Sequence, residues 1–243
     1  MFKPGLKQID KQGIKIYGKN MPYRKTPLVA GQFYHVFNRS IARLPIFQNK
    51  RDYERMIRTI DYYRYPNPPL RFSFFDRLPA DKKEDFLKEL KNTKIPMVEI
   101  ISYCLMPNHF HFLLHPLTGF GVSHFIRNVQ HSYSKYFNTK NDRSGSLFQG
   151  MFKAVLIETD EQFIHVCRYI HLNPVSSYLI EIDDLKNYPW SSFKDLGNFT
   201  GSSFVNFQPV MEHFKTVEAY KRFVFDQADY QRVLGEIKHL TIE

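Results

Sequence analysis

The most constraining feature of this sequence is a pair of apolar runs separated by a three-residue turn. The runs cover residues 97–105 and 110–115, and residues 106–108 (Met-Pro-Asn) between them are of turn-forming types. Two strands joined this closely pair as an antiparallel hairpin. The chain is therefore expected to contain an antiparallel sheet that includes this hairpin.

The second strand of the hairpin has two unlike faces, because successive side chains of a strand point to opposite sides. One face carries His109, His111, Leu113 and His115, and the other carries Phe110, Phe112 and Leu114. The phenylalanine face is expected to seal a core. His109 and His111 lie close enough for two neutral imidazoles to bind one divalent cation. Taken alone, however, two histidines in an apolar strand are more often core or edge residues.

His115 shares this face but is expected to have a different role. It follows His111 by four residues, which places it about 13 Å further along an extended strand. That distance is too long for a shared cation, so we expect a polar role at the sheet edge.

The segments around the hairpin predict further strands and helices. Strands are expected at 32–38 and 151–157, and helices at 51–63, 80–92, 123–137 and 159–172. The last helix is expected to end at Asn173-Pro174, because proline disfavours helix at the residue before it. The order β-α-(insert)-β-β-α-β-α predicts an α+β fold, an antiparallel sheet with helices packed on one face.

The chain divides into three parts. Residues 1–27 are rich in lysine and arginine and are expected to be a basic N-terminal arm. Residues 28–195 are expected to form one domain, with an insertion at about 65–96. Residues 196–243 are expected to form a C-terminal extension with helices.

Composition and charge favour a folded protein with a polyanionic partner. Of 243 residues, 43% are hydrophobic and 16% aromatic, which is typical of a packed globular protein. Lys and Arg exceed Asp and Glu by 34 to 24, and the resulting charge of +10 favours nucleic acid. Cys104 and Cys167 have no disulfide-type or metal-type spacing, and no long apolar segment is present. A cytoplasmic protein without a membrane partner is therefore expected.

The helix at 159–172 adds a second group of polar residues. Tyr169 and Asn173 are four residues apart and share a helix face with Gln162 and His165. A phenol with a pKa of about 10 is a poor nucleophile, so it needs a cation that also polarises the phosphate under attack. Two histidines and one amide oxygen fill part of an octahedral shell and leave positions open for phosphate and water.

Two other tyrosines are alternative nucleophiles. Tyr133 and Tyr136 lie on the helix that follows the histidines, so they are close to them in sequence. Neither has a metal-type partner at helical spacing, and packing beside Phe137 explains them as well. Tyr169 is favoured because Asn173 is its partner.

Four blocks of the sequence together resemble a known family. The blocks are 103-YCLMPNHFHFLLHP-116, 143-RSGSLFQGMFKAV-155, 168-RYIHLNPV-175 and 188-YPWSSF-193. In this order they are similar to the single-tyrosine HUH transposases, and especially to the REP-associated tyrosine transposases. The resemblance runs from about residue 30 to 195. The sequence departs from the family at Phe148, where members commonly have tryptophan, and at the insertion and the C-terminal extension.

The resemblance implies a function and a set of site residues. His109 and His111 correspond to the metal-binding His-hydrophobic-His pair, Tyr169 to the nucleophile and Asn173 to the third metal ligand. It also implies a ferredoxin-like sheet, Mg²⁺ or Mn²⁺, a 5′-phosphotyrosine intermediate and a single-stranded or hairpin DNA substrate. The protein would act as a monomer or homodimer that cleaves and rejoins this DNA.

Basic residues interleaved with aromatics are expected to contact the DNA. They are Arg39, Arg43, Arg127, Lys135, Arg143 and Lys153. Two other functions stay open at this point. One is a domesticated nucleic-acid-binding regulator that keeps the fold without catalysis, and the other is a metal-dependent nuclease that uses water in place of tyrosine.

Overall fold

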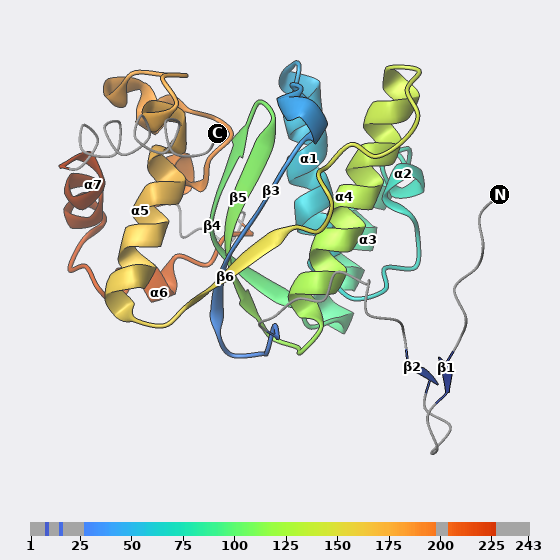
Figure 1. Ribbon diagram of the computed structural model, residues 1–243, viewed down its shortest axis with the longest axis horizontal. Helices are drawn as coiled ribbons and strands as arrows, with labels where there is room; N and C mark the ends of the chain where they lie inside the picture. The colour runs from blue at the N-terminus through green and yellow to red at the C-terminus, as the bar shows by residue number, and fades with distance from the viewer. Residues whose placement is uncertain (1–7, 10–14, 17–26, 198–203, 227–243) are drawn as a thin grey trace.

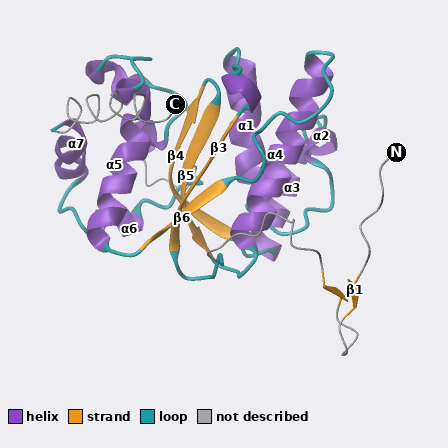
Figure 2. Ribbon diagram, viewed as in Figure 1, coloured by secondary structure: helices purple, strands orange, loops and turns teal. Residues whose placement is uncertain are grey.

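The sheet at the centre of the molecule has four antiparallel strands (Figures 1 and 2). The computed structural model describes residues 8–9, 15–16, 27–197 and 204–226. The strands are β3 (Phe33–Arg39), β4 (Val98–Met106), β5 (His109–Pro116) and β6 (Lys153–Ile157), in the order β4-β5-β3-β6. β4 and β5 are the predicted hairpin, which is thereby confirmed.

Little of the predicted basic arm falls within the described residues. The strands β1 (Gln8–Ile9) and β2 (Lys15–Ile16) pair with each other in antiparallel register. The rest of 1–26, and residues 198–203 and 227–243 of the C-terminal extension, lie outside the described residues.

The helices match most of the predicted segments. The α-helices are α1 (Lys50–Tyr63), α2 (Phe72–Phe75), α3 (Ala80–Thr93), α4 (Gly121–Lys140), α5 (Asp160–Ser176), α6 (Gln208–Met211) and α7 (Val217–Phe225). Short 3-10 helices are η1 (Ile41–Arg43), η2 (Ile182–Asn187) and η3 (Ser192–Asp195). Thr159 caps α5 by accepting a hydrogen bond from the Gln162 backbone N–H, as the sequence Thr-Asp-Glu-Gln suggests.

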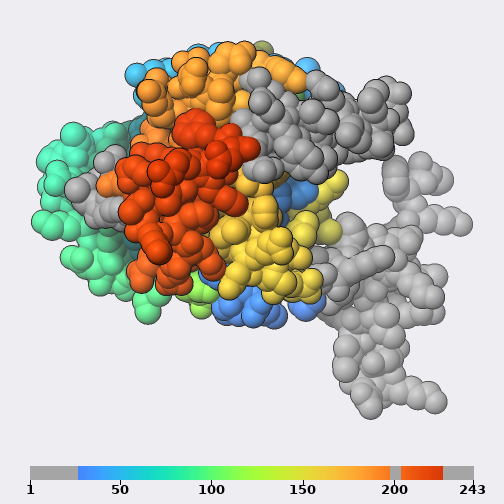
Figure 3. Space-filling view, turned by 90° about the vertical axis from the view of Figure 1, so that its left-hand side faces the viewer, coloured from blue at the N-terminus to red at the C-terminus, as the bar shows by residue number. Residues whose placement is uncertain are grey.

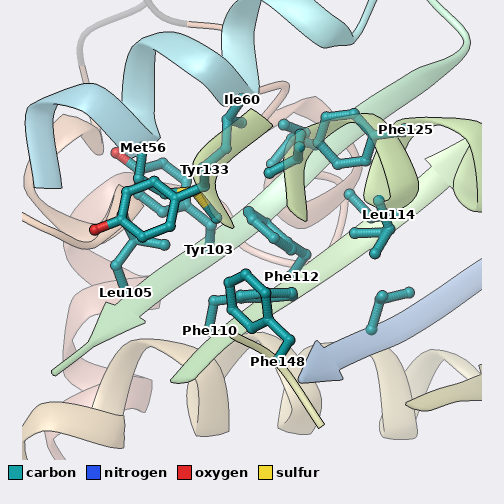
Figure 4. Close-up of a cluster of buried hydrophobic side chains, with 14 of the residues drawn as sticks. Met56, Ile60, Tyr103, Leu105, Phe110, Phe112, Leu114, Phe125, Tyr133 and Phe148 are labelled. Carbon is teal, nitrogen blue, oxygen red and sulfur yellow. The ribbon is translucent and has the colours of Figure 1, made fainter. Parts of the chain in front are cut away.

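One face of the sheet forms the larger core with α1 and α4. Phe110, Phe112 and Leu114 of β5 are fully buried there, against Phe125 and Tyr133 of α4 (Figure 4). The unit β3-α1-β4-β5-α4-β6, with its strand order, has the expected ferredoxin-like topology. The predicted role of the phenylalanine face is confirmed.

Helices also cover the other face of the sheet, which corrects the expectation of helices on one face only. That expectation holds for α1 and α4, but α5 lies across the sheet from them (Figure 1). The reason is that β4 and β5 are apolar on both sides. Ile101, Cys104 and Leu113 point away from the first core and are buried under α5, and their burial favours a second layer of helices.

The C-terminal extension belongs to this second layer. Phe207, Val210, Tyr220 and Val224 are buried in the same cluster as α5. In Figure 3, which looks at this side of the molecule, the red C-terminal segment lies over the middle of the face. The described part of the extension is therefore packed onto the domain.

The end of α5 differs from the predicted one. The helix continues through Pro174 to Ser176, although proline lacks an N–H and loses one helical hydrogen bond. The last turn is retained because Leu172 and Val175 are fully buried. The carbonyl of Pro174 also accepts a hydrogen bond from the N–H of Leu179 at 2.9 Å. Burial of this turn outweighs the missing bond.

The predicted insertion at about 65–96 contains α2 and α3. Phe72 and Phe75 form a separate small cluster with Tyr62 of α1, and Leu90 of α3 is buried. The amphipathic helix expected at 80–92 is confirmed. Both helices lie on the α1 side, away from β5 and α5 (Figure 1).

Candidate functional site

The two histidines of β5 lie side by side on the face that α5 covers. Their ring centroids are 5.1 Å apart. His111 is buried, and His109, at the start of the strand, is partly exposed. The alternation predicted from the sequence is therefore present, with Phe110 between them on the opposite face.

His109 is held in the form that binds metal ions. Its Nδ1 lies 2.6 Å from the Oδ1 of Asn108, the last residue of the hairpin turn. Burial, together with a smaller effect of the charge of Arg39, its partner on β3, lowers the pKa of His109 to about 4. The imidazole is neutral at pH 7, as a metal ligand must be.

His111 is surrounded by side chains from neighbouring elements. Its Nδ1 lies 2.9 Å from the Nε2 of His35 on β3, and its ring stacks on Phe37 with centroids 5.4 Å apart. Neither contact was predicted from the sequence. Alternation along β3 could have placed His35, Phe37 and Arg39 on one face, but the pairing of β3 with β5 was needed to bring them to His111.

Tyr169 of α5 lies against these histidines. Its ring is edge-on to His111 with centroids 5.5 Å apart and to His35 at 5.7 Å. Burial raises the pKa of Tyr169, and hydrogen bonding by Asn173 and the charge of Arg39 partly offset that rise. A phenol in this setting is mostly protonated at neutral pH, so it needs help to become a nucleophile.

Asn173 lies one helical turn beyond Tyr169 and is buried. Its Nδ2 donates to the backbone carbonyl of Tyr169 at 2.9 Å, which fixes the orientation of the amide. The Oδ1 oxygen is the amide atom suited to a hard divalent cation. The four predicted site residues are thus connected by contacts: His109 with His111, His111 with Tyr169, and Tyr169 with Asn173.

The donor types at this site fit Mg²⁺ or Mn²⁺. Neutral imidazoles and an amide oxygen are ligands that Mn²⁺ accepts, and Mg²⁺ prefers the oxygen. Among the described residues, no group of three or more His, Cys, Asp or Glu side chains is arranged to hold a metal ion. A cation bound by His109 and His111 would therefore depend on the Asn173 amide, phosphate or water for its remaining ligands.

The alternative tyrosines lie on the opposite side of the sheet. The Tyr133 hydroxyl donates to the carbonyl of Ile46 at 2.6 Å, and the Tyr136 hydroxyl donates to the Asp52 carboxylate at 2.8 Å. Burial raises the pKa of Tyr136 to about 12. Both hydroxyls are used in packing α4 against α1 and the segment before it, and the sheet separates them from the histidine pair.

His115 makes the polar contact expected of it, although β5 is a central strand of the sheet and not an edge strand. The Nδ1 of His115 lies 2.8 Å from a carboxylate oxygen of Glu99. Trp190 stacks on Tyr53 with centroids 4.5 Å apart, and Cys104 and Cys167 are buried free thiols. The His115 and Trp190 contacts join neighbouring elements, whereas Cys104 lies on β4 directly opposite His111.

The six basic residues predicted to contact DNA do not form one surface. Arg39 lies opposite His109 in the sheet, and exposed Lys153 of β6 pairs with Phe37, so both accompany the histidines. Arg127 and Lys135 are exposed on α4, across the sheet. Arg43 and Arg143 lie near a cavity of about 240 Å³ that is formed by the segment after β3 and the loop after α4. Arg143 lines this cavity, and Arg43 lies in the segment beside it.

Comparisons with known proteins find a matching family model. The family model described as "Transposase IS200 like" matches residues 71–173, a segment that includes His109 and His111 and ends at Asn173. The match confirms the predicted resemblance to tyrosine transposases. It begins at residue 71, within the predicted insertion at about 65–96. A comparison with curated proteins finds no match.

One solved structure has the same fold. It is described as a REP-associated tyrosine transposase bound to a REP hairpin, and it is 16% identical to this chain with a TM-score of 0.50. The alignment covers 76% of this chain and 89% of that one. The similarity confirms the predicted α+β fold. Among the described residues, no helix is long and apolar enough to cross a membrane.

Proposed function

We propose that this protein is a metal-dependent transposase that cleaves and rejoins single-stranded hairpin DNA through a 5′-phosphotyrosine intermediate. The observation that carries the proposal is the position of Tyr169, edge-on to His111 and one helical turn from Asn173. The match of residues 71–173 to the transposase family model supports it. So does the fold shared with a hairpin-bound transposase.

The proposed reaction begins at the hydroxyl of Tyr169. Its oxygen attacks the scissile phosphorus, the bond from phosphorus to the 3′ oxygen breaks, and a 5′-phosphotyrosine forms. The phenolic proton is released and the departing 3′ oxygen takes up a proton, so the step consumes none overall. A second 3′ hydroxyl can then attack the phosphotyrosine, which restores Tyr169 and joins the strands without ATP.

The remaining residues prepare this reaction. His109, His111 and Asn173 would hold Mg²⁺ or Mn²⁺, which when bound polarises the phosphate and stabilises its developing charge. Arg39 and Lys153 lie where they can attract the phosphate backbone toward the sheet face. Tyr169 is only partly exposed and contacts His111 and His35, so water is excluded from part of its ring.

The test is a search for the covalent adduct. Hairpin oligonucleotides taken from DNA flanking the coding region are incubated with the full chain and Mn²⁺, then separated under denaturing conditions. A label at the 3′ end should migrate with the protein, whereas a label at the 5′ end should be released on a free strand. The reverse pattern would contradict a 5′-phosphotyrosine.

Tyr169→Phe separates the proposal from its alternatives. The variant should bind hairpin DNA as the wild type does but form no adduct and make no cut, because only the hydroxyl is removed. A water-using nuclease would keep most of its cleavage. Tight binding by the wild type without any adduct would favour a regulator without catalysis.

A further inference from the structure

A third histidine lies against the candidate metal ligands. His35 of β3 places its Nε2 2.9 Å from the Nδ1 of His111, and the two rings stack with centroids 5.1 Å apart. In the sheet register His35 is opposite Leu113, so it reaches His111 diagonally across the two strands. The pairing register of β3 and β5 therefore brings the His35 and His111 side chains into contact.

The proton in this contact decides whether His111 can bind a cation. Two neutral imidazoles at this distance share one proton. If the Nδ1 of His111 carries and donates it, the Nε2 of His111 keeps its lone pair. If the Nε2 of His35 donates instead, the His111 proton is on Nε2, and that atom cannot coordinate.

The surroundings of His111 hinder a ring flip that would exchange its nitrogens. Phe37 stacks on one side of the ring, and Tyr169 lies edge-on to it. His111 is also only 6% exposed. With the ring fixed, Nδ1 stays at His35, so a cation bound by His111 would be bound through Nε2.

We propose that His35 is a positioning residue that accepts a hydrogen bond from the Nδ1 of His111 and so holds His111 in the tautomer whose Nε2 binds the divalent cation. The inference rests on the proposed function, since it assigns His35 to the metal site of that reaction. In other metalloproteins a carboxylate or a backbone carbonyl behind the ligating histidine has this role.

The other histidine of the pair has a matching arrangement. Asn108 Oδ1 lies 2.6 Å from the Nδ1 of His109, so each imidazole has its partner on the same ring atom. An amide oxygen only accepts, which gives His109 its proton on Nδ1 and its lone pair on Nε2. His35 would give His111 the same form, so both histidines would offer Nε2 to one cation.

The first test measures Mn²⁺ affinity without DNA, by electron paramagnetic resonance of free Mn²⁺ during titration of the full chain. His35→Phe keeps a ring but removes the acceptor, and loss of such a partner typically weakens binding about 10- to 100-fold. His35→Gln restores an acceptor oxygen and should recover much of the affinity. His115→Phe is the control, because it makes the same change on the same sheet face, at Glu99 and away from His109 and His111.

The second test observes the tautomer itself. Nitrogen NMR of histidine-labelled, metal-free protein should show the His111 proton on Nδ1 in the wild type, and a shift toward Nε2 in His35→Phe. Thermal unfolding establishes that each variant is folded before its affinity is compared.

The outcomes separate this inference from the proposed function. Unchanged Mn²⁺ affinity in folded His35→Phe, or a wild-type His111 with its proton on Nε2, would overturn the role of His35 alone. A wild type that binds no Mn²⁺ would overturn the metal-dependent function together with the role of His35. Weak binding by both His35→Phe and His35→Gln would indicate a packing role and also count against the proposal.

Discussion

His171 is a buried histidine of α5 that the proposed reaction does not use. Its Nδ1 lies 2.7 Å from the Tyr220 hydroxyl of α7, and its Nε2 lies 2.8 Å from the Ser192 hydroxyl. The Ser192 hydroxyl in turn accepts from the backbone N–H of Tyr103 on β4. One side chain thus joins the helix of Tyr169 to the sheet and to the C-terminal extension.

Burial gives His171 a predictable effect on stability. It lowers the pKa from 6.5 to about 3, so the folded protein keeps His171 neutral where the unfolded chain is protonated. Stability should fall as pH drops below about 6.5, by at most about 1.4 kcal/mol per pH unit from this group. Urea unfolding of wild type and His171→Gln between pH 7.5 and 5 measures it, and the variant should have the shallower dependence on pH.

Exposed His131 of α4 supplies the control, and His131→Gln should follow the wild-type pH dependence. His109, whose pKa is also lowered, contributes with the same sign in all three proteins. If His171→Gln lost stability with falling pH as steeply as the wild type, His171 would not be the group responsible.

Sequence could predict the residues of the site that follow local periodicity. His109 and His111 follow from alternation in one strand, and Tyr169 and Asn173 from one turn of one helix. His35 could not be found in this way, because its contact joins residues 76 positions apart through the strand register. Local patterns give side-chain direction, whereas register depends on how the whole sheet assembles.

At the scale of elements, the choice of nucleophile is a choice between α4 and α5. Both helices pack on the sheet, but on opposite faces, and only α5 lies over His109 and His111. The sequence placed the helices well, but it did not show that β4 is buried on both sides. The second layer of helices was missed for this reason.

A pair of matched substitutions distinguishes which of the two helices carries the nucleophile. Tyr133→Phe removes a buried hydroxyl that donates to the Ile46 carbonyl, and it should lower the free energy of unfolding by about 1–2 kcal/mol. Its adduct yield should equal that of the wild type at a temperature where both are folded. Tyr169→Phe should lose the adduct under the same conditions, at a temperature where the variant is folded. Loss of the adduct in folded Tyr133→Phe would indicate that the nucleophile lies on α4.

At the scale of the whole molecule, the charge of +10 supports nucleic-acid binding but does not say where the strand lies. The positions of the basic residues do. Lys153 is on β6 beside Phe37, on the sheet face of the candidate site. Arg127 is exposed on α4, on the far side of the first core. A DNA strand that reaches Tyr169 therefore passes Lys153 and does not pass Arg127.

Salt dependence distinguishes the two positions. Each phosphate contact adds about 0.7–1 to the slope of log affinity against log salt, since neutralised phosphates release counterions. Lys153→Gln should lower the slope by about one such contact, whereas Arg127→Gln should leave it at the wild-type value. Both changes remove one exposed positive charge, so the net charge falls equally and only the position differs. Fluorescence anisotropy of a labelled hairpin across a salt series, in EDTA so that no strand is cut, measures the slopes. Equal slopes for the two variants would mean that the strand follows the overall field of the protein, and not the sheet face on which Tyr169 lies.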